Sequence, residues 1–367
     1  MGRDPGDQFP YAAFFWPALV AISAAETASS VAAHLLGRSD DVDDVRAQQE
    51  PERATPSRIA LDLQAVRLRD FTVGRSGVPT LLCPPLALHG AAIADLAAGH
   101  SLVATLREAG IERLFMADWR SASADMRFLG IDEYLAALNV LVDHLGGLVD
   151  LVGLCQGGWL SLVYAGRFPA KVRKLVMAGA PVDIAARQSA LSALAEATPL
   201  IVFENLVKSG DGLVIGRNVA PLWANGTDAN DIRESLQIDL PIGAPELSRL
   251  EAIFRNWNSW TIDVPGKYYL EVVEKLYKHN ELASGNFVAL GKRIDLSRLL
   301  LPIYLLVGSV DKVVAPEQLL AVERLVGTRP ESLRRAIAPC GHLSLFMGKR
   351  TLEEVWPGIV CWMKEAD

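Results

Sequence analysis

Short apolar runs alternate with amphipathic stretches along most of the chain, and the two kinds of segment predict different elements. The apolar runs end at Pro, Gly or Asp, which is typical of buried parallel strands. We expect strands within VPTLLCPPL, RLFMADW, VDLVGL, VRKLVMAGAPVD, LPIYLLVGSVD and LRRAIAPCGH, and helices in IDEYLAALNVLVDHLGG, in the stretch after Cys155, near 316–326 and from about 351 to 364. The earlier stretch IALDLQAVRLRDFT alternates apolar and polar residues, as an edge or antiparallel strand does. Strands that alternate with helices predict an α/β fold with a mostly parallel, doubly wound sheet.

One long segment interrupts this alternation. Residues 184–295 contain helical patterns and many aromatic residues, and the strand–helix alternation resumes after them. We therefore predict one α/β core made of residues 59–183 and 296–367, with residues 184–295 inserted as a helical cap, or lid, over an active site. The aromatic residues fit either a surface that holds an apolar acyl chain or the core of the cap itself.

The first 58 residues have a different character. Residues 1–37 include an apolar, Ala-rich stretch that Pro17 and Glu26 interrupt, so it is short for a membrane span. We predict an apolar N-terminal helix there, packed on its own domain or on a second subunit, with a lipid-like or granule surface as the alternative. Residues 38–58 are charged and polar without apolar periodicity, which predicts a flexible linker.

Composition and charge exclude some functions. The 367 residues carry a formal net charge of −7 and are 50% hydrophobic, so a large core is expected and a role in binding nucleic acid is not. The four cysteines, Cys83, Cys155, Cys340 and Cys361, are widely and irregularly spaced. That spacing favours neither a zinc site nor a disulfide framework, and the start of the chain does not resemble a secretory signal. We expect a cytoplasmic protein without a metal.

Cys155 stands where a predicted strand becomes a predicted helix, in the sequence GLCQG. Glycines two places before and after it, Gly153 and Gly157, suit a turn too tight for a Cβ atom at either place. The N-terminus of the following helix would favour a thiolate, and the backbone N–H of Gln156 would face a substrate oxyanion. The pattern predicts a nucleophile elbow with sulfur in place of the usual serine oxygen.

Two later residues complete a catalytic set. Asp311 follows one predicted strand and His342 follows the next, so nucleophile, acid and base occur in the chain order of α/β-hydrolases. We predict that Cys155, Asp311 and His342 form a triad in which His342 takes the thiol proton and Asp311 orients the imidazole.

Further site residues are expected around this triad. Pro84 and Pro85 fix a loop in which Leu86 or Ala87 would offer the second oxyanion N–H. His89, in the same loop, and Trp159, in the helix after Cys155, are candidate substrate contacts, although an ordinary loop histidine is an equal alternative for His89.

From about residue 60 to 365 the chain resembles the polyhydroxyalkanoate synthase family, most of all the short class that works with a second subunit. The resemblance rests on LLCPPLAL, MADW, GLCQGGWLSLVYA, VRKLVMAGAPVD, GNFVALGKRIDLSRLLLPIYLLVGSVDKVVAP and GHLSLFMGK. It implies an α/β-hydrolase fold and a Cys–Asp–His triad that transfers 3-hydroxyacyl groups from coenzyme A thioesters to a growing polyester. It implies no cofactor beyond the coenzyme A of the substrate.

Two positions differ from the family pattern. Lys312 follows the triad Asp where the family usually has His, and Leu88 stands near a place where the oxyanion loop usually carries Asn. GHLSLFMGK also resembles the intracellular depolymerases of the same polymer. Polymer synthesis and hydrolysis of a thioester or polyester therefore both remain open, as do the partners: a 3-hydroxyacyl-CoA, a polyester chain, a second copy in a homodimer, a second synthase subunit or a granule surface.

Overall fold

The computed structural model describes residues 50–87, 89–219, 228–238 and 242–365. The predicted N-terminal helix and residues 38–49 of the predicted linker lie outside the described residues. So does Leu88, one of the two positions that depart from the family pattern.

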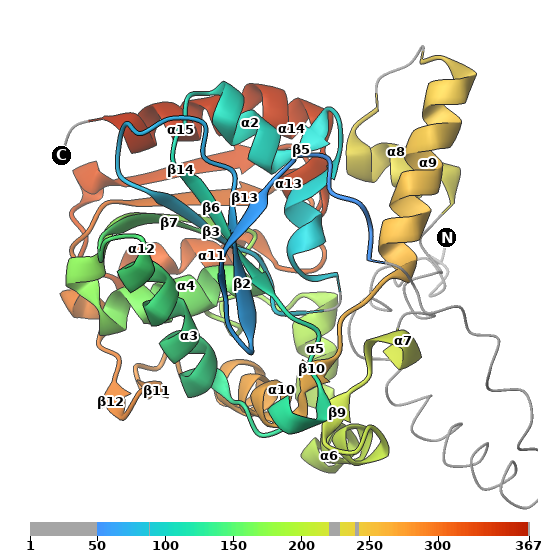
Figure 1. Ribbon diagram of the computed structural model, residues 1–367. Coiled ribbons are helices and arrows are strands. Elements are labelled where there is room, and N and C mark those ends of the chain that lie inside the picture. The colour runs from blue at the N-terminus through green and yellow to red at the C-terminus, as the bar shows by residue number, and fades with distance from the viewer. Residues whose placement is uncertain (1–49, 88, 220–227, 239–241, 366–367) are drawn as a thin grey trace, which may run out of the picture.

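A central eight-stranded sheet organises the described chain (Figure 1). Its strand order is β1-β2-β6-β3-β7-β8-β13-β14, and the strands are β1 Arg58–Asp62, β2 Val66–Asp70, β6 Leu114–Trp119, β3 Thr80–Cys83, β7 Val149–Leu154, β8 Val172–Ala178, β13 Ile303–Gly308 and β14 Leu333–Ala338. All pairs from β6 to β14 are parallel, whereas β1 and β2 are antiparallel to their neighbours. The predicted mostly parallel, doubly wound sheet is confirmed.

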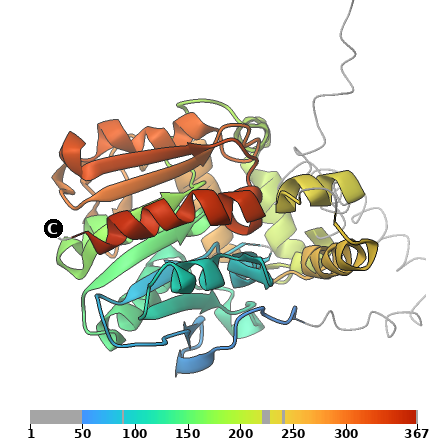
Figure 2. The same cartoon turned by 90° about the horizontal axis from the view of Figure 1, so that it is seen from above.

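Helices cover both faces of the sheet (Figures 1 and 2). One face carries α2 Leu102–Glu108, α14 Lys349–Glu354 and α15 Trp356–Lys364, and the other carries α3 Ile131–His144, α4 Gln156–Arg167, α11 Pro316–Leu320 and α12 Val322–Leu325. Two buried hydrophobic clusters correspond to these two faces. The central strands β3 and β7 are buried along their whole length, because parallel strands between two helical layers have no face left for water.

Three elements differ in detail from the sequence expectation. The alternating stretch 59–72 is a hairpin, β1–β2, and Leu63 closes its turn by donating its N–H to the Val66 carbonyl at 2.9 Å. The helix expected at 316–326 is divided into α11 and α12, and the last helix is divided into α14 and α15 at Val355. Periodicity shows which face of these segments is apolar, but it does not show such local breaks.

The inserted segment, residues 184–295, is mainly helical where it is described. It contains α5 Ala190–Ala197, α6 Leu200–Ser209, α7 Gly216–Val219, α8 Ala229–Leu236, α9 Ala244–Ser259, α10 Gly266–Val272 and the π-helix η8 Val273–Lys278, with two short strand pairs, β9 Leu213–Val214 with β10 Val264–Pro265 and β11 Val288–Ala289 with β12 Lys292–Arg293. Its apolar residues join the two clusters of the core: Phe203, Tyr268 and Leu276 belong to one, and Ile232 and Trp257 to the other. The segment therefore packs on the sheet domain on both sides.

The end of the predicted linker is not free of the core. The Arg53 side chain is 7% exposed and donates to Asp118 of β6 at 2.8 Å. Thr55 is buried and donates its hydroxyl to Asp95 at 2.8 Å. The expectation of a flexible linker is therefore wrong for this part of 38–58. Its polar composition reflects buried polar pairing, which a sequence without apolar periodicity does not reveal.

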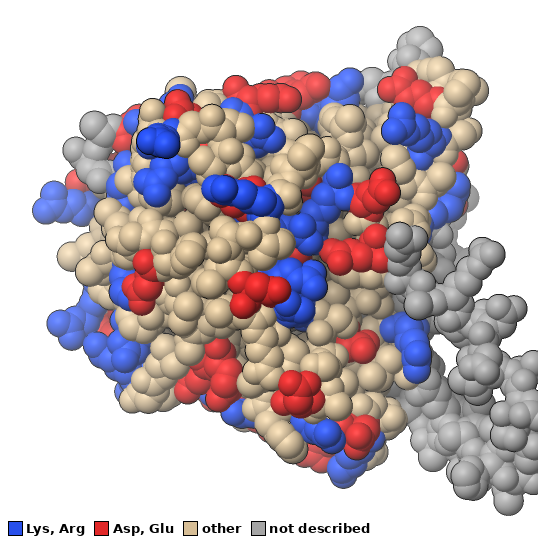
Figure 3. All heavy atoms as spheres, viewed as in Figure 1, with Lys and Arg blue, Asp and Glu red and all other residues tan. Residues whose placement is uncertain are grey.

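The surface carries mixed charge. On the face shown in Figure 3, basic and acidic side chains are interspersed over the described part of the chain. Among the described residues, no single helix is both long and apolar enough to cross a membrane, although α5 and α6 would pass on length and composition as a pair, bent by 93°.

Candidate active site

Cys155 occupies a sharp turn between β7 and α4. Its backbone angles are φ 50° and ψ −123°, a conformation that a residue with a Cβ atom rarely adopts. Strain of this kind persists where the surrounding structure enforces it, and it is commonest at functional sites. The side chain lies at the carboxyl edge of the sheet, directly before the first turn of α4, and the residue is 4% exposed.

The glycines of the elbow are required by close backbone contacts. A Cβ atom on Gly157 would lie 1.9 Å from the Cys83 carbonyl oxygen, and one on Gly153 would lie 2.5 Å from the Gly158 Cα. Both separations are shorter than atoms tolerate, and the contacted atoms are backbone that cannot rotate away. The sequence argument for these two glycines is confirmed, and the strand β3 lies directly against the start of α4.

Asp311 and His342 meet at the same edge. Asp311 follows β13, His342 follows β14, and the His342 Nδ1 is 2.7 Å from the Asp311 Oδ2. The other carboxylate oxygen, Oδ1, accepts the backbone N–H groups of Val313 and Val314 at 2.8 and 2.9 Å. These bonds fix the carboxylate, and the carboxylate in turn fixes the imidazole ring. The expected hydrogen-bond contact between the two residues is confirmed.

His342 is coupled to Cys155 through charge. Burial alone lowers the pKa of His342, but the Asp311 carboxylate and then the Cys155 thiolate outweigh it and raise the pKa to about 10. Among the described residues the His342 Nε2 has no hydrogen-bond partner of ordinary geometry, but the Cys155 side chain faces the ring closely enough to raise its pKa by hydrogen bonding as well. The ring is therefore held by Nδ1, while Nε2 stays available at a site where the thiolate favours the protonated form.

The expected oxyanion groups surround the same position. Gln156 is the first residue of α4, so its backbone N–H has no acceptor within the helix. Leu86 is buried, and the Ala87 carbonyl accepts the Gly90 N–H at 2.7 Å. The loop that carries them begins at Cys83, whose carbonyl lies against Gly157. A donor role for Gln156, Leu86 or Ala87 stays a prediction.

His89 and Trp159, the two candidate substrate contacts, are both buried against other side chains of the protein. The His89 ring is buried, lies 4.3 Å from the Trp257 ring of α9 and has its Nδ1 2.7 Å from the Trp260 carbonyl oxygen. Burial lowers the pKa of His89 to about 4, so it is neutral at pH 7. His89 therefore ties the oxyanion loop to the end of α9.

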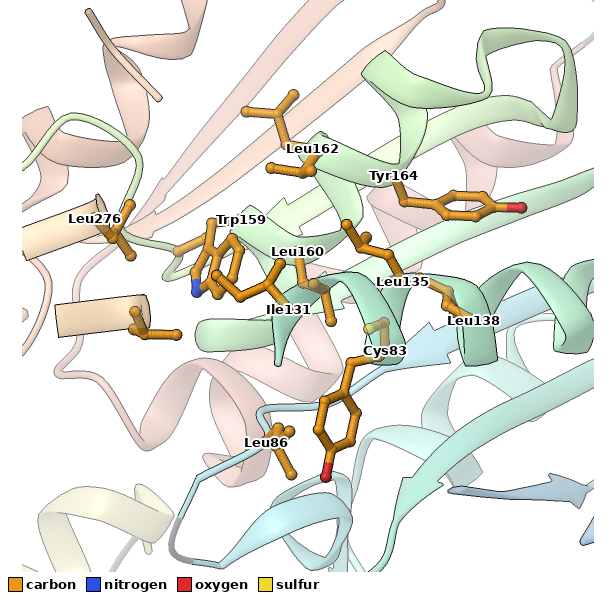
Figure 4. Packing of buried hydrophobic residues seen from close by; sticks show 14 of the residues in the cluster. Cys83, Leu86, Ile131, Leu135, Leu138, Trp159, Leu160, Leu162, Tyr164 and Leu276 are labelled. Carbon is orange, nitrogen blue, oxygen red and sulfur yellow. The ribbon is translucent and has the colours of Figure 1, made fainter. Parts of the chain in front are cut away.

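Trp159 lies in the hydrophobic core, where Figure 4 shows it among the buried side chains of one cluster. It has no exposed surface, its ring is 6.1 Å from that of Phe287, and its Nε1 donates to the Gln156 Oε1 at 2.5 Å. A direct substrate contact by Trp159 does not fit this position, because one apolar face of α4 packs inward. Its indole touches the neighbour of the nucleophile instead.

Two tyrosines of the inserted segment lie near Cys155: Tyr268 is one of the aromatic residues for which the sequence left open a role in holding an acyl chain, and Tyr277 was missed by the sequence argument. Burial and then other charges, including that of Cys155, raise the pKa values of Tyr268 and Tyr277. Tyr277 also accepts a hydrogen bond from the Gln156 Nε2 at 3.0 Å. Both residues come from the inserted segment, far from Cys155 in sequence, and no spacing rule relates them to it.

Two further cysteines, Cys83 and Cys340, are buried. Burial raises the pKa of Cys83 to about 12 and that of Cys340 to about 11, which keeps both protonated at neutral pH. Among the described residues, no group of three or more His, Cys, Asp or Glu side chains is arranged to hold a metal ion.

The chain is similar to known polymer-forming enzymes over most of its length. It is 27% identical to the poly(3-hydroxyalkanoate) polymerase subunit PhaC of Haloferax mediterranei, over 91% of this chain and 69% of that one. The PhaC subunit of Synechocystis sp. is 28% identical over 74% of both chains, and that of Allochromatium vinosum is 25% identical over 69% of this chain and 71% of that one. A family model described as PHB de-polymerase C-terminus matches residues 246–367.

Solved structures show the same fold at low sequence identity. A monoacylglycerol lipase of Paleococcus ferrophilus matches with a TM-score of 0.53 and 16% identity, covering 81% of this chain and 98% of that one. An epoxide hydrolase of Bacillus megaterium matches with a TM-score of 0.54 and 15% identity, covering 83% and 99%. The similarity to the polyhydroxyalkanoate synthase family that the sequence motifs indicate is thus confirmed, on an α/β-hydrolase fold.

Proposed function

We propose that the protein is an acyltransferase of the polyhydroxyalkanoate synthase type, with Cys155, His342 and Asp311 as its catalytic triad. The observation that carries the proposal is the thiol on a strained elbow that shares a buried edge with the hydrogen-bonded His342–Asp311 pair. The relatives are named poly(3-hydroxyalkanoate) polymerase subunits, which supports a 3-hydroxyacyl unit as the transferred group, and the family resemblance implies coenzyme A as its carrier. No cofactor is needed beyond that substrate.

In the first half-reaction, the Cys155 thiolate attacks the thioester carbonyl carbon. The oxyanion that forms accepts hydrogen bonds from the Gln156 N–H and from a donor in the loop at Leu86 or Ala87. The carbon–sulfur bond to coenzyme A then breaks, and the departing thiolate takes the proton from the His342 Nε2. The raised pKa of His342 suits this step, because the imidazole is already protonated beside the thiolate.

In the second half-reaction, the hydroxyl of another 3-hydroxyacyl unit attacks the acyl group on Cys155. The neutral His342 Nε2 accepts the hydroxyl proton, an ester bond forms, and the bond to the Cys155 sulfur breaks. The thiolate and the protonated imidazole are thereby restored. Asp311 keeps Nε2 directed at the reacting atoms throughout, since it holds the ring by Nδ1.

Hydrolysis is the second candidate function, and the match of residues 246–367 to a depolymerase C-terminal family favours it. The acyl-enzyme would be the same, but water would resolve it. The outcome depends on how well the inserted segment, acting as a cap, excludes water from the acyl group. The 4% exposure of Cys155 supports exclusion of water and therefore transfer.

One experiment tests the proposal and separates the two functions. The purified full chain is incubated with 3-hydroxybutyryl-CoA, and released coenzyme A, sedimentable polymer and free 3-hydroxybutyrate are measured. We expect polymer in the wild type and a loss of at least about 10⁴-fold in turnover in Cys155→Ala. Cys361→Ala is the matched control, because that thiol is exposed and lies away from the elbow. Free acid without polymer would favour the hydrolase, and normal turnover in Cys155→Ala would refute the triad.

The partners belong to the same proposal. The relatives are named as polymerase subunits, which supports a second subunit or a homodimer as the working assembly. Attachment to a polymer granule through residues 1–37 remains a prediction. Granule attachment is tested by mixing preformed polymer with either the full chain or a truncation that lacks residues 1–49. The fraction of each protein that sediments with the polymer is then measured.

A further inference from the structure

We propose that Tyr277 is a positioning residue through which the inserted segment holds Gln156, the residue after the nucleophile, in its working orientation. This inference rests on the proposed acyl transfer and adds a component that the triad does not contain. Its physical basis is a chain of two hydrogen bonds that runs from the π-helix η8 through the Gln156 amide to Trp159.

The Gln156 side chain is held at both ends. An indole N–H can only donate, so the Gln156 Oε1 faces Trp159 at 2.5 Å, and its Nε2 must then donate to the Tyr277 hydroxyl at 3.0 Å. The amide orientation is thereby determined without ambiguity. Trp159 is fully buried in α4, so one of the two anchors belongs to the rigid core.

The other anchor belongs to the inserted segment. Tyr277 lies in η8, which follows α10 without a break, and its ring is 5% exposed. A π-helix is rare, is often found at functional sites and places its side chains differently from an α-helix of the same sequence. Lys278, the next residue, donates to the Glu196 carbonyl at 2.9 Å and so ties η8 to the end of α5. Tyr277 is therefore held in place from its own side as well.

The hydrogen bond between Tyr277 and Gln156 lies next to the nucleophile, where it can affect the reaction. The Gln156 backbone N–H heads α4 beside Cys155, and the charge of Cys155 acts on the Tyr277 phenol. With both hydrogen bonds in place, the Gln156 side chain is fixed beside its backbone N–H. Without the Tyr277 hydroxyl, the amide keeps only the Trp159 anchor and the backbone donor is held less firmly, which affects the oxyanion because misplacement by about 1 Å costs roughly 10²-fold in rate.

The test uses Tyr277→Phe, which keeps the ring and removes the hydroxyl. The readout is the acylation burst with a p-nitrophenyl ester, which reports attack by Cys155 without requiring the coenzyme A substrate. We expect the burst rate constant at saturating ester to fall roughly 10-fold to 100-fold, with little change in the ester concentration for half-saturation. Tyr269→Phe is the matched control, because that tyrosine is partly buried in α10, eight residues before Tyr277, and its ring packs on Phe203 instead.

A second variant separates positioning from mere stability. Trp159→Phe removes the other anchor of the same amide, so its effect on the burst should combine with Tyr277→Phe in a non-additive way. A lowered melting temperature in Tyr277→Phe with an unchanged burst rate would overturn the inference, and so would additive effects of the two variants. A normal burst in the wild type with no turnover of 3-hydroxybutyryl-CoA would instead refute only the proposed function.

Discussion

Replacing Gly157 with Ala tests the most closely packed part of the elbow. The new Cβ atom would lie 1.9 Å from the Cys83 carbonyl oxygen and 2.6 Å from that of Pro84. Reaching even 3.0 Å from the first oxygen requires a movement of about 1.1 Å, the difference between the two distances. Because both contacts are backbone atoms on a central strand and its following loop, we expect a cost of about 1–3 kcal/mol or more from overpacking.

The measurement is a thermal melt combined with the acylation burst. A loss of this size lowers the melting temperature by roughly 1–4 °C, because a chain of 367 residues shifts by only about 1 °C per kcal/mol. The burst should fall as well, because the movement separates the oxyanion loop from the start of α4. Gly358→Ala is the control, since nothing lies within 4 Å of its added Cβ atom in helix α15. A Gly157→Ala protein with the wild-type melting temperature and burst would refute the close contact between β3 and α4.

Three further predictions concern the charges of the site and the start of the described chain. Asp311→Asn should lower turnover by roughly 10²-fold to 10⁴-fold in a folded protein, because the imidazole loses the carboxylate that orients and charges it; unchanged turnover would remove Asp311 from the triad. The pKa of His342 in the folded protein, about 10, exceeds its ordinary value of 6.5, so the stability that its charged form contributes is complete below about pH 6.5 and is lost as the pH rises through about 10. The melting temperature should therefore fall between these two pH values, and it should fall less in His342→Gln. Deleting residues 1–49 should leave acylation by a soluble thioester intact, whereas deleting residues 1–57 should cost about 1–3 kcal/mol, because Asp118 and Asp95 lose Arg53 and Thr55 and keep only Arg69 and Ser101 as partners; equal melting temperatures of the two truncations would contradict the packing of that segment.

The parts of the fold that sequence predicted are those that leave a periodic or local signal. The run VDLVGL followed by GLCQG shows a buried strand that turns into a helix, because burial, glycine spacing and the helix pattern all occur within one short stretch. Asp311 and His342 could be paired across the sheet since parallel strands present their carboxyl ends at one edge.

The parts that sequence did not predict depend on contacts between distant segments. Nothing around Tyr277 indicates that its hydroxyl meets Gln156, 121 positions away. Trp159 was a candidate substrate contact because it is a large aromatic residue in the helix after the nucleophile. It is buried in the core instead, because it belongs to the apolar face of α4. Arg53 and Thr55 lie in a polar stretch that looks like linker, and only the partners Asp118 and Asp95 show that the stretch is packed.

The arrangement of the four thiols determines how the protein responds to oxidants. Cys83 and Cys340 are buried and remain protonated, so they are poor targets for peroxide, which attacks thiolates. Cys361, on the outer surface of α15, is the exposed thiol, whereas Cys155 is covered. During mild oxidation, the exposed Cys361 thiol can therefore be lost without a loss of activity. Activity is lost permanently only when Cys155 itself is oxidised as far as a sulfinic acid, which cellular thiols do not reduce.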